Sequence, residues 1–178
     1  MKQVLSAIHA RFRQLRNGEI VDNLAAQGIT YRIAWGLESY RLREIALEQE
    51  QSVELAEALW AEDVRESKML ATRLFPIEEM SIEKAKCWIA DTKYIELADQ
   101  MCMNLLAKLP FAMTLAEELS AKDYKEAPIE IYTALKLATR IEAKNETVHD
   151  LADSLLNSDA PIFLKTAALW YNQTYEQI

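Results

Sequence analysis

Apolar residues recur at spacings of three and four along most of the chain, and no segment alternates apolar and polar residues with a period of two. Leu, Ala, Glu and Lys dominate, and these residues favour helices. Side chains that can cap a helix start, together with Gly and Pro residues that can end one, delimit ten or eleven helices. The expected helices cover about residues 2–15, 19–27, 39–49, 52–61, 63–75, a segment capped by Ser81, a segment capped by Thr92 that ends before Pro110, 111–122, 126–143, 147–157 and 160–176.

A short motif, Leu-Ala-acid-x-Leu, recurs along these expected helices. It occupies residues 55–59, 115–119 and 151–155, and a looser copy occupies 97–101. The last two full copies begin 36 residues apart, which is the length of a helix-pair repeat. Stacked pairs share a core that one pair cannot bury alone, and they leave a concave surface for a partner. The pattern therefore predicts an all-α fold, an α-solenoid (α-α superhelix) of stacked antiparallel helix pairs.

Length and charge refine this prediction. The chain is expected to form one domain, residues 1–178, with basic N-terminal helices in 1–35 and stacked helix pairs in 36–178. The net charge of −8 argues against a general binder of polyanions. Residues 1–43 nevertheless carry seven Lys and Arg against three Asp and Glu, so this segment has a net charge of +4. If a surface binds nucleic acid, the N-terminal helices are the first candidates.

Several function classes lack their sequence signals. No apolar run reaches the roughly 18 residues of a membrane span, and the N-terminus lacks the features of a signal peptide, so a cytoplasmic protein without membrane contact is expected. Two cysteines and two distant histidines do not form a zinc site, and neither metal nor cofactor is expected. Cys87 and Cys102 are interpreted as buried structural thiols. Phosphate loops, nucleophile elbows and dinucleotide fingerprints are absent.

Three stretches together match the pattern of a known family. They are Gly36-Leu37 with Leu42-Arg43 and Ile45-Ala46, then Leu59-Trp60 with Glu66, Lys68 and Leu70-Ala71, and finally Asp99 five residues after Tyr94. From about Trp35 to Trp170 the chain resembles the DNA alkylation repair enzyme family, the HEAT-like repeat bacterial DNA glycosylases. The resemblance implies HEAT-like helix pairs whose concave face cradles duplex DNA.

The resemblance also implies a chemistry. Active members excise positively charged N3- or N7-alkylated purines without flipping the base into a pocket, which departs from the usual strategy. A carboxylate stabilises the positive charge that develops on the deoxyribose and can position the attacking water. Aromatic faces attract the cationic nucleotide, and an Arg grips the phosphates around the lesion.

Asp99 matches the family's carboxylate and is the candidate catalytic residue. The family's Trp four residues earlier falls on Ile95, with Tyr94 beside it as a candidate for stacking on a nucleotide. A shift of one residue turns a side chain by about 100° around a helix, so Tyr94 does not directly replace that Trp. Asp99 also has a structural interpretation, because it occupies the acidic position of the recurring motif.

The family's second Trp and its Arg are displaced or missing. After residues 165–168 the Trp is expected at Leu169, but Trp170 follows one residue late. Trp170 is a candidate for nucleotide stacking, and alternatively a core anchor of the last helix; Trp60 is interpreted as core. No Arg or Lys lies between Glu126 and Lys136, where the phosphate-gripping Arg is expected.

Basic residues at helical spacing provide a separate route to DNA binding. Lys136, Arg140 and Lys144 recur every four residues, so one face of one helix is expected to carry all three. The candidate contacts to the DNA backbone are Arg43, Arg65, Lys68, Lys136, Arg140, Lys144 and Lys165. The alternative is a solvated outer face with local ion pairs.

Three hypotheses follow. The first is a divergent, catalytically degraded member of the family that serves as a scaffold for DNA structures or for a protein. The second is an active alkylpurine DNA glycosylase that uses Asp99, Tyr94 and Trp170 in one cleft. The third is an unrelated helical-repeat adaptor, which the acidic net charge would suit.

Overall fold

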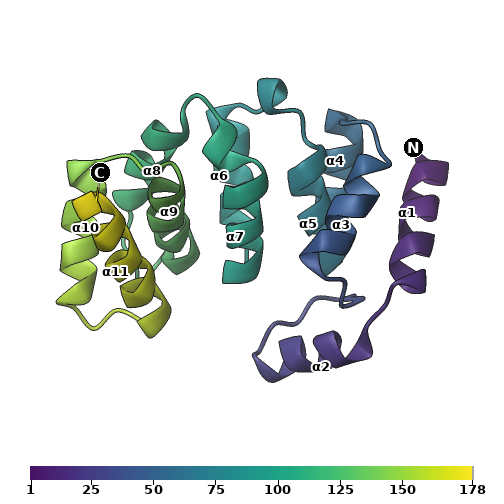
Figure 1. Ribbon diagram of the computed structural model, residues 1–178, viewed down its shortest axis with the longest axis horizontal. Helices are drawn as coiled ribbons and strands as arrows, with labels where there is room; N and C mark the ends of the chain where they lie inside the picture. Colours follow the sequence, from purple (N-terminus) through teal and green to yellow (C-terminus); the bar gives the residue numbers. More distant parts are fainter. Residues whose placement is uncertain (178) are drawn as a thin grey trace. The chain divides into compact units, whose positions relative to one another are not determined.

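The computed structural model describes residues 1–177, and this part of the chain contains eleven α-helices and no strand (Figure 1). The all-α prediction is confirmed. The helices are α1 (Lys2–Gln14), α2 (Gly18–Ala26), α3 (Ser39–Leu47), α4 (Val53–Trp60), α5 (Arg65–Leu74), α6 (Ile82–Ala90), α7 (Ile95–Asn104), α8 (Ala112–Ser120), α9 (Pro128–Arg140), α10 (Glu146–Leu156) and α11 (Ile162–Gln177), with short 3-10 turns η1 (Ile77–Glu79) and η2 (Leu106–Lys108).

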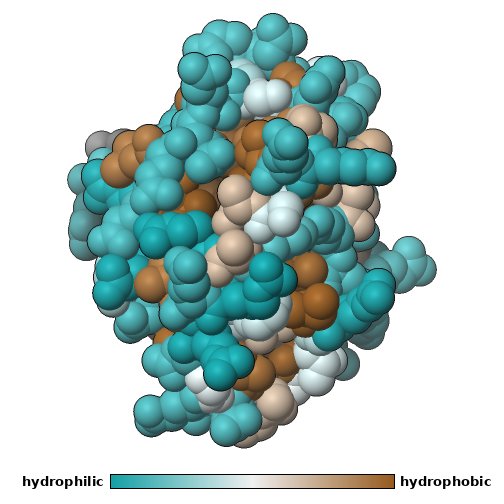
Figure 2. All heavy atoms as spheres, turned by 90° about the vertical axis from the view of Figure 1, so that its right-hand side faces the viewer, coloured by the Kyte–Doolittle hydropathy of each residue, from teal (hydrophilic) through white to brown (hydrophobic). Residues whose placement is uncertain are grey.

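The chain divides into two compact units, Met1–Glu79 and the part that starts at Met80. In the first unit α5 packs against both α3 and α4, and α1 buries Ile8 and Phe12. Figure 2 shows the α1 end, where hydrophilic side chains surround small apolar patches. That the chain forms one domain remains a prediction.

A buried carboxylate organises the first unit. Glu66 is fully buried on α5, and its two oxygens accept hydrogen bonds from three consecutive backbone N–H groups. These donors are Trp35 at 2.9 Å, Gly36 at 2.9 Å and Leu37 at 3.2 Å. The guanidinium of Arg65 donates to Glu66 at 2.8 Å and to the Leu37 carbonyl at 3.0 Å. A buried charge is tolerated only when it is paired and hydrogen-bonded, and this carboxylate meets both conditions.

Gly36 fits this loop for a steric reason. Its φ is +74°, a conformation that side chains with a Cβ rarely adopt. A Cβ at this position would lie 2.1 Å from the backbone oxygen of Asn17, which precedes α2. Glu66 and Gly36 together therefore fix the entry to α3, so two residues of the family pattern are parts of the architecture.

The second unit has two helical layers. The helices α7, α9 and α11 pack side by side in one layer, and α8 and α10 contact each other in the second layer. The pairs α8–α9 and α10–α11 join the layers. The core of α9, the central helix, consists of apolar side chains from its buried face: Ile131, Ala134, Leu135, Leu137 and Ala138. The layer of α7, α9 and α11 carries the candidate site.

Several expected helix boundaries were wrong. Thr92 does not cap α7, because its hydroxyl donates back to the Trp88 carbonyl; α7 begins after Tyr94. The cap of α10 is Asn145, whose side chain accepts from the backbone N–H of Val148, so the helix begins at Glu146 and not at the expected 147. Both cases show a competing local hydrogen bond that the spacing of polar residues does not reveal.

One of the two cysteine predictions was wrong. Cys102 is buried as expected, but Cys87 is exposed, because α6 turns Ala85, Trp88 and Ile89 toward the core and leaves position 87 outside.

No helix within residues 1–177 is both long and apolar enough to cross a membrane.

Candidate nucleic-acid interface

Asp99 lies at the centre of a polar contact between α7 and α9. The Tyr132 hydroxyl donates toward both carboxylate oxygens, at 3.0 and 3.1 Å. The Lys136 ammonium lies 3.4 Å from one of these oxygens and forms an ion pair with it. The Asp99 side chain is 41% exposed, whereas the Lys136 side chain is 17% exposed. The carboxylate is therefore near the surface but already has a hydroxyl and a cation as partners.

Lys136 also lies among aromatic rings. Its ammonium is 4.8 Å from the ring centroid of Trp170 on α11 and 5.9 Å from that of Tyr132, one turn earlier on α9. Phe163 packs at 5.9 Å against Tyr132. Cation–π attraction holds a positive charge at such positions, so the protein's own lysine occupies the place that two aromatic faces offer to a cation.

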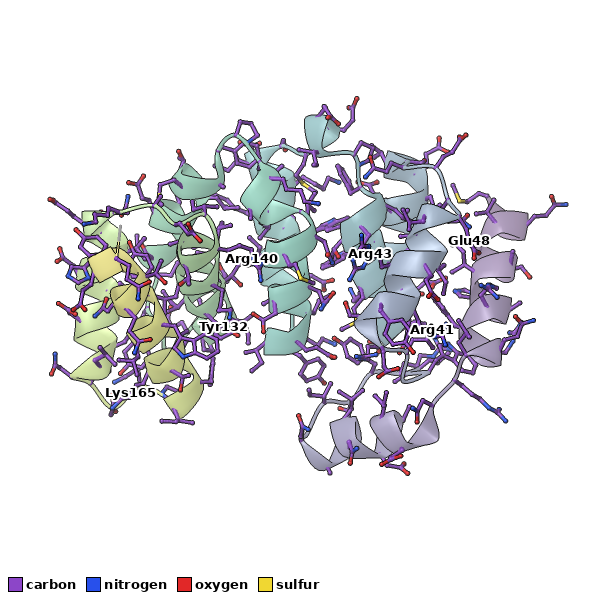
Figure 3. All side chains as sticks on the ribbon, viewed as in Figure 1. Arg41, Arg43, Glu48, Tyr132, Arg140 and Lys165 are labelled. Atoms are coloured by element: carbon purple, nitrogen blue, oxygen red, sulfur yellow. The ribbon has the colours of Figure 1, made fainter. Side chains whose placement is uncertain are left out.

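A cavity of about 260 Å³ opens beside these residues, and three helices line it. Its lining residues are Ile95 from α7, Tyr132 and Lys136 from α9, and Phe163, Thr166, Ala167 and Trp170 from α11. Figure 3 shows Tyr132 and Arg140 on the same helix of this layer. The cavity is mostly apolar, with one ammonium group at its wall.

The surroundings of Asp99 change the acidity of its neighbours. Burial raises the pKa of Tyr132 well above its ordinary value, and the Asp99 charge together with the Tyr132–Asp99 hydrogen bond raises it further. Burial also raises the pKa of the Cys102 thiol to about 12, with Asp99 as a second cause. Both groups therefore stay neutral at physiological pH, and Tyr132 remains a hydrogen-bond donor to the carboxylate.

The two aromatic residues predicted to stack on a nucleotide, Trp170 and Tyr94, lie in different places relative to the cavity. Trp170 lines the cavity and is 52% exposed, so its interpretation as a core anchor was wrong. The buried face of α11 consists of Leu164, Ala167, Ala168 and Tyr171, and this register turns Trp170 toward α9. Tyr94 precedes α7 and does not line the cavity; Ile95 lines it instead. Trp170 thus lines the cavity, and two other lining residues, Tyr132 and Lys136, contact Asp99.

The contacts of Asp99 differ in kind from those of the other acidic residues in the recurring motif. The full copies of the recurring motif lie on α4, α8 and α10, whereas the looser copy lies on α7, in the layer with α9 and α11. The acidic residue of the α8 copy, Glu117, accepts from Asn145, and that of the α10 copy, Asp153, accepts from Asn172. Asp99 instead contacts a tyrosine and a lysine at a cavity, so its sequence position is similar and its surroundings are different.

The basic row on α9 is shorter than expected. Helix α9 ends at Arg140, and Glu142 has a φ of +50°, so the chain leaves the helix before Lys144. Lys144 instead lies 5.2 Å from the ring centroid of Tyr175. Arg140 is exposed one turn after Lys136. The expectation that one helix face carries all three cations was therefore wrong for Lys144.

Lys165 lies on another side of α11 from the cavity, two residues after Phe163. A hydrogen bond from Tyr124 lowers the pKa of Asp159, Lys125 lowers it further, and Lys165 makes a smaller contribution. This places Lys165 near an acidic residue at the start of α11.

The remaining candidate cations belong to the first unit. Arg65 is 5% exposed and holds Glu66 and the Leu37 carbonyl, so its burial does not favour a contact with DNA. The Lys68 ammonium donates to the Trp60 carbonyl at 2.9 Å and lies 4.5 Å from the ring centroid of that residue. Trp60 is 7% exposed, as its interpretation as core requires. Arg43 alone among the three cations is exposed.

Sequence reasoning missed Tyr132 and Phe163. A usable signal existed for Tyr132, since it lies four residues before Lys136 and therefore on the same helix face. Its contact with Asp99 spans 33 residues and depends on the packing of α7 against α9.

No three His, Cys, Asp or Glu side chains within residues 1–177 are arranged to hold a metal ion.

Helix pairs stacked in two layers, with an aromatic cavity on one layer, define an α-solenoid of the HEAT-like type. Residues 8–125 match the family model described as DNA alkylation repair enzyme. The match covers well over half of the chain, so the protein belongs to the DNA alkylation repair enzyme family, as the sequence resemblance implied. The matched segment includes Glu66 and Asp99 but ends before α9 and α11, which provide most of the cavity.

A solved structure has the same fold. It is described as representing a new family of proteins related to the HEAT-like repeat DNA glycosylases with affinity for branched DNA structures. The similarity has a TM-score of 0.81 at 16% sequence identity and covers 95% of this chain and 74% of that chain. No curated protein sequence matches this chain significantly. The HEAT-like fold is thereby confirmed.

Proposed function

We propose that this protein is a non-catalytic member of its family that binds branched or otherwise structured DNA through the layer of α7, α9 and α11. The observation that carries the proposal is the pairing of Asp99 with the Tyr132 hydroxyl and the Lys136 ammonium. A carboxylate that must stabilise a developing positive charge acts best when its negative charge is available to the substrate. Here Lys136 already balances that charge.

The aromatic residues support the same conclusion. Excision of a cationic alkylated base relies on aromatic faces that attract positive charge. In this protein the Lys136 ammonium lies over the Trp170 ring, and Ile95 occupies the position where the resemblance expects the other Trp. A cationic base would meet a like charge at this place. The site therefore disfavours the alkylated purines that active members excise.

DNA is the preferred partner for two reasons. The structurally similar protein has affinity for branched DNA, and the fold shared by the two proteins covers nearly all of this chain. In addition, Lys136 balances the charge of the nearby Asp99, and Arg140, one turn later on α9, adds an exposed positive charge. Local positive charge of this kind can contact phosphates even though the net charge of the chain is negative.

Fluorescence anisotropy with labelled DNA tests the proposal. We expect a four-way junction to bind more tightly than a linear duplex of the same length, with an affinity that falls as salt rises. Arg140→Gln is expected to reduce the salt slope by about one. Lys86→Gln is the matched control, because Lys86 pairs with Glu118 of α8, outside the proposed layer. No binding to either DNA at micromolar protein and low salt would contradict the proposal and favour a protein partner.

One observation favours a second function, an active glycosylase. Asp99 retains 41% exposure of its side chain and lies beside a cavity that contains Trp170. If Lys136 moved away when DNA binds, the carboxylate would be free to act. Release of alkylated bases from duplex DNA distinguishes the two functions directly.

A further inference from the structure

We propose that the cavity of α7, α9 and α11 receives one unpaired, uncharged nucleobase at a DNA branch point, and that Lys136 makes this site select against cationic bases. This inference rests on the proposed function, since it names the part of a branched DNA that the layer recognises. It reverses the charge preference that the family resemblance implies. The inference is based on an ammonium group that lies near two aromatic rings at the wall of an apolar cavity.

The size and lining of the cavity suit a single ring system. Its volume of about 260 Å³ lies below the roughly 300–1,000 Å³ typical of sites for drug-sized ligands. Three of its seven lining residues are aromatic, namely Tyr132, Phe163 and Trp170. Every nucleobase has a π-face that can stack on such rings, whatever its sequence context. Trp170 is 52% exposed, so part of its ring surface remains available to a ligand.

The polar groups define the charge of the ligand. Lys136 is the one charged residue in the lining, and its ammonium can donate to an acceptor such as a base carbonyl or ring nitrogen. Tyr132 directs its hydroxyl to Asp99, and the Thr166 hydroxyl donates to the Ile162 carbonyl, so neither of these hydroxyl protons is directed to a ligand. Asp99, the ion-pair partner of Lys136, does not line the cavity, so the ammonium is the nearer charge to a bound base. A base with an acceptor edge is therefore complemented by Lys136, whereas an alkylated base with positive charge is disfavoured.

A branch point is the part of a DNA molecule that offers such a base. Withdrawing a base from a paired stack costs free energy, and the cost is least for a base that is already unpaired. Arg140 lies one turn beyond Lys136 on α9 and is exposed, where it can contact the phosphate of the same nucleotide or of its neighbour. The cavity and this cation together fit a nucleotide at the junction of duplex arms.

The test uses a three-way junction with one unpaired 2-aminopurine at the branch point, and a second junction with 2-aminopurine paired within an arm. Binding is followed by anisotropy and stacking by 2-aminopurine fluorescence. We expect the protein to quench the unpaired probe and to leave the paired probe unchanged. Trp170→Ala should abolish the quenching and weaken binding of the unpaired-base junction by about ten-fold, the scale of one base–aromatic stack.

Leu169→Ala provides the control, because Leu169 is an exposed neighbour on α11 that does not line the cavity. It should keep both the quenching and the affinity. Circular dichroism of each variant establishes that the helices remain. Since Trp170 is half exposed, its replacement leaves the core of α11 intact.

Charge selectivity is tested by placing guanine or cationic N7-methylguanine at the unpaired position. The wild-type protein should bind the guanine junction more tightly, and Lys136→Met should remove or reverse this preference. The ratio of the two affinities cancels the loss of any phosphate contact by Lys136.

The outcomes separate this inference from the proposed function. Tight binding of the branched DNA without quenching of the unpaired probe, or quenching that persists in Trp170→Ala, would overturn the inference and leave the proposed function standing. A wild-type preference for N7-methylguanine would also overturn it. Absence of binding to every DNA would overturn both.

Discussion

Glu66 in the first unit and Asp99 in the second unit are both carboxylates with several polar partners, but their surroundings are opposite. Glu66 in the first unit is fully buried and accepts from three backbone N–H groups and one guanidinium. Asp99 in the second unit is 41% exposed and accepts from one tyrosine hydroxyl beside one lysine. Most partners of Glu66 are backbone groups of one loop, whereas both partners of Asp99 are side chains that line a cavity.

The difference explains why the same family pattern contains both residues. A buried carboxylate with backbone donors maintains a local chain path, and replacing it damages the fold. A half-exposed carboxylate beside a cavity contributes little to stability and can change its role through its neighbours. Glu66 therefore belongs to the architecture of the first unit, whereas Asp99 lies where a neighbouring cation, Lys136, balances its charge.

The largest expected effect is that of Glu66→Ala. Removal of the carboxylate takes away the anionic partner of the Arg65 guanidinium and the side-chain acceptor of three buried N–H groups, and the free energy of unfolding should fall by about 3–5 kcal/mol. Urea unfolding followed by circular dichroism measures this change. Glu66→Gln keeps the shape and one acceptor oxygen, so it should cost less. Equal stability of wild type and Glu66→Ala would show that the hydrogen bonds of the Glu66 carboxylate do not stabilise the fold.

Gly36→Ala is expected to have the next largest effect. The new Cβ would require a left-handed conformation and would meet the Asn17 backbone oxygen at 2.1 Å, so we expect a loss of about 2–3 kcal/mol. Gly18→Ala is the matched control, because a Cβ there has no neighbouring atom within 4 Å. That control should be neutral or slightly stabilising at the start of α2. Similar losses in both variants would contradict the steric explanation.

These two residues show what the sequence could predict. The spacing of apolar residues identified the helices, and the family pattern identified Gly36 and Glu66, although it did not reveal that they meet. Their contact is a hydrogen bond between a side chain and the backbone across 30 residues, and no residue type identifies a backbone donor. Packing alone brings them together.

The candidate site was predicted less completely. Asp99 and Trp170 were identified through the resemblance, and Lys136 through its spacing on α9. Its position over the Trp170 ring depends on the register of α11 against α9, which the sequence does not encode locally. The repeated motif did not reveal that its copy on α7 lies in a different helical layer from the copies on α8 and α10.

Tyr132→Phe sharpens the comparison through its pH dependence. Burial and then Asp99 raise the pKa of Tyr132 in the folded state above its ordinary value near 10. The stability that depends on its neutral form is therefore present below about pH 10 and is lost as the pH rises above that value. The variant should lose about 1 kcal/mol at neutral pH with its hydrogen bond, and should then lose less stability than the wild type above pH 10.

Thermal unfolding between pH 8 and 11 measures this difference. The buried Cys102 thiol, whose pKa is raised to about 12, and Tyr171, whose pKa is also raised by burial, contribute to the alkaline loss that remains in Tyr132→Phe. Identical pH profiles for the two proteins would contradict the close contact of Tyr132 with Asp99.

Asp99→Asn should have the smallest effect on stability. Its ion pair is partly exposed and screened by solvent, so the free energy of unfolding should change by less than about 1 kcal/mol. Measured beside Glu66→Gln under the same conditions, it isolates the effect of burial on otherwise similar carboxylate-to-amide changes. A loss as large as that of Glu66→Gln would mean that Asp99 is a structural residue.

The most direct test of the account is a single-turnover excision assay on duplex DNA that contains N7-methylguanine or N3-methyladenine, with the wild-type protein and Asp99→Asn. Because Lys136 and Tyr132 hold the carboxylate, we predict base release by the wild type that does not exceed spontaneous release and does not differ from that of Asp99→Asn. Release by the wild type above this background, lost in Asp99→Asn, would contradict the account and assign the protein to the active glycosylases.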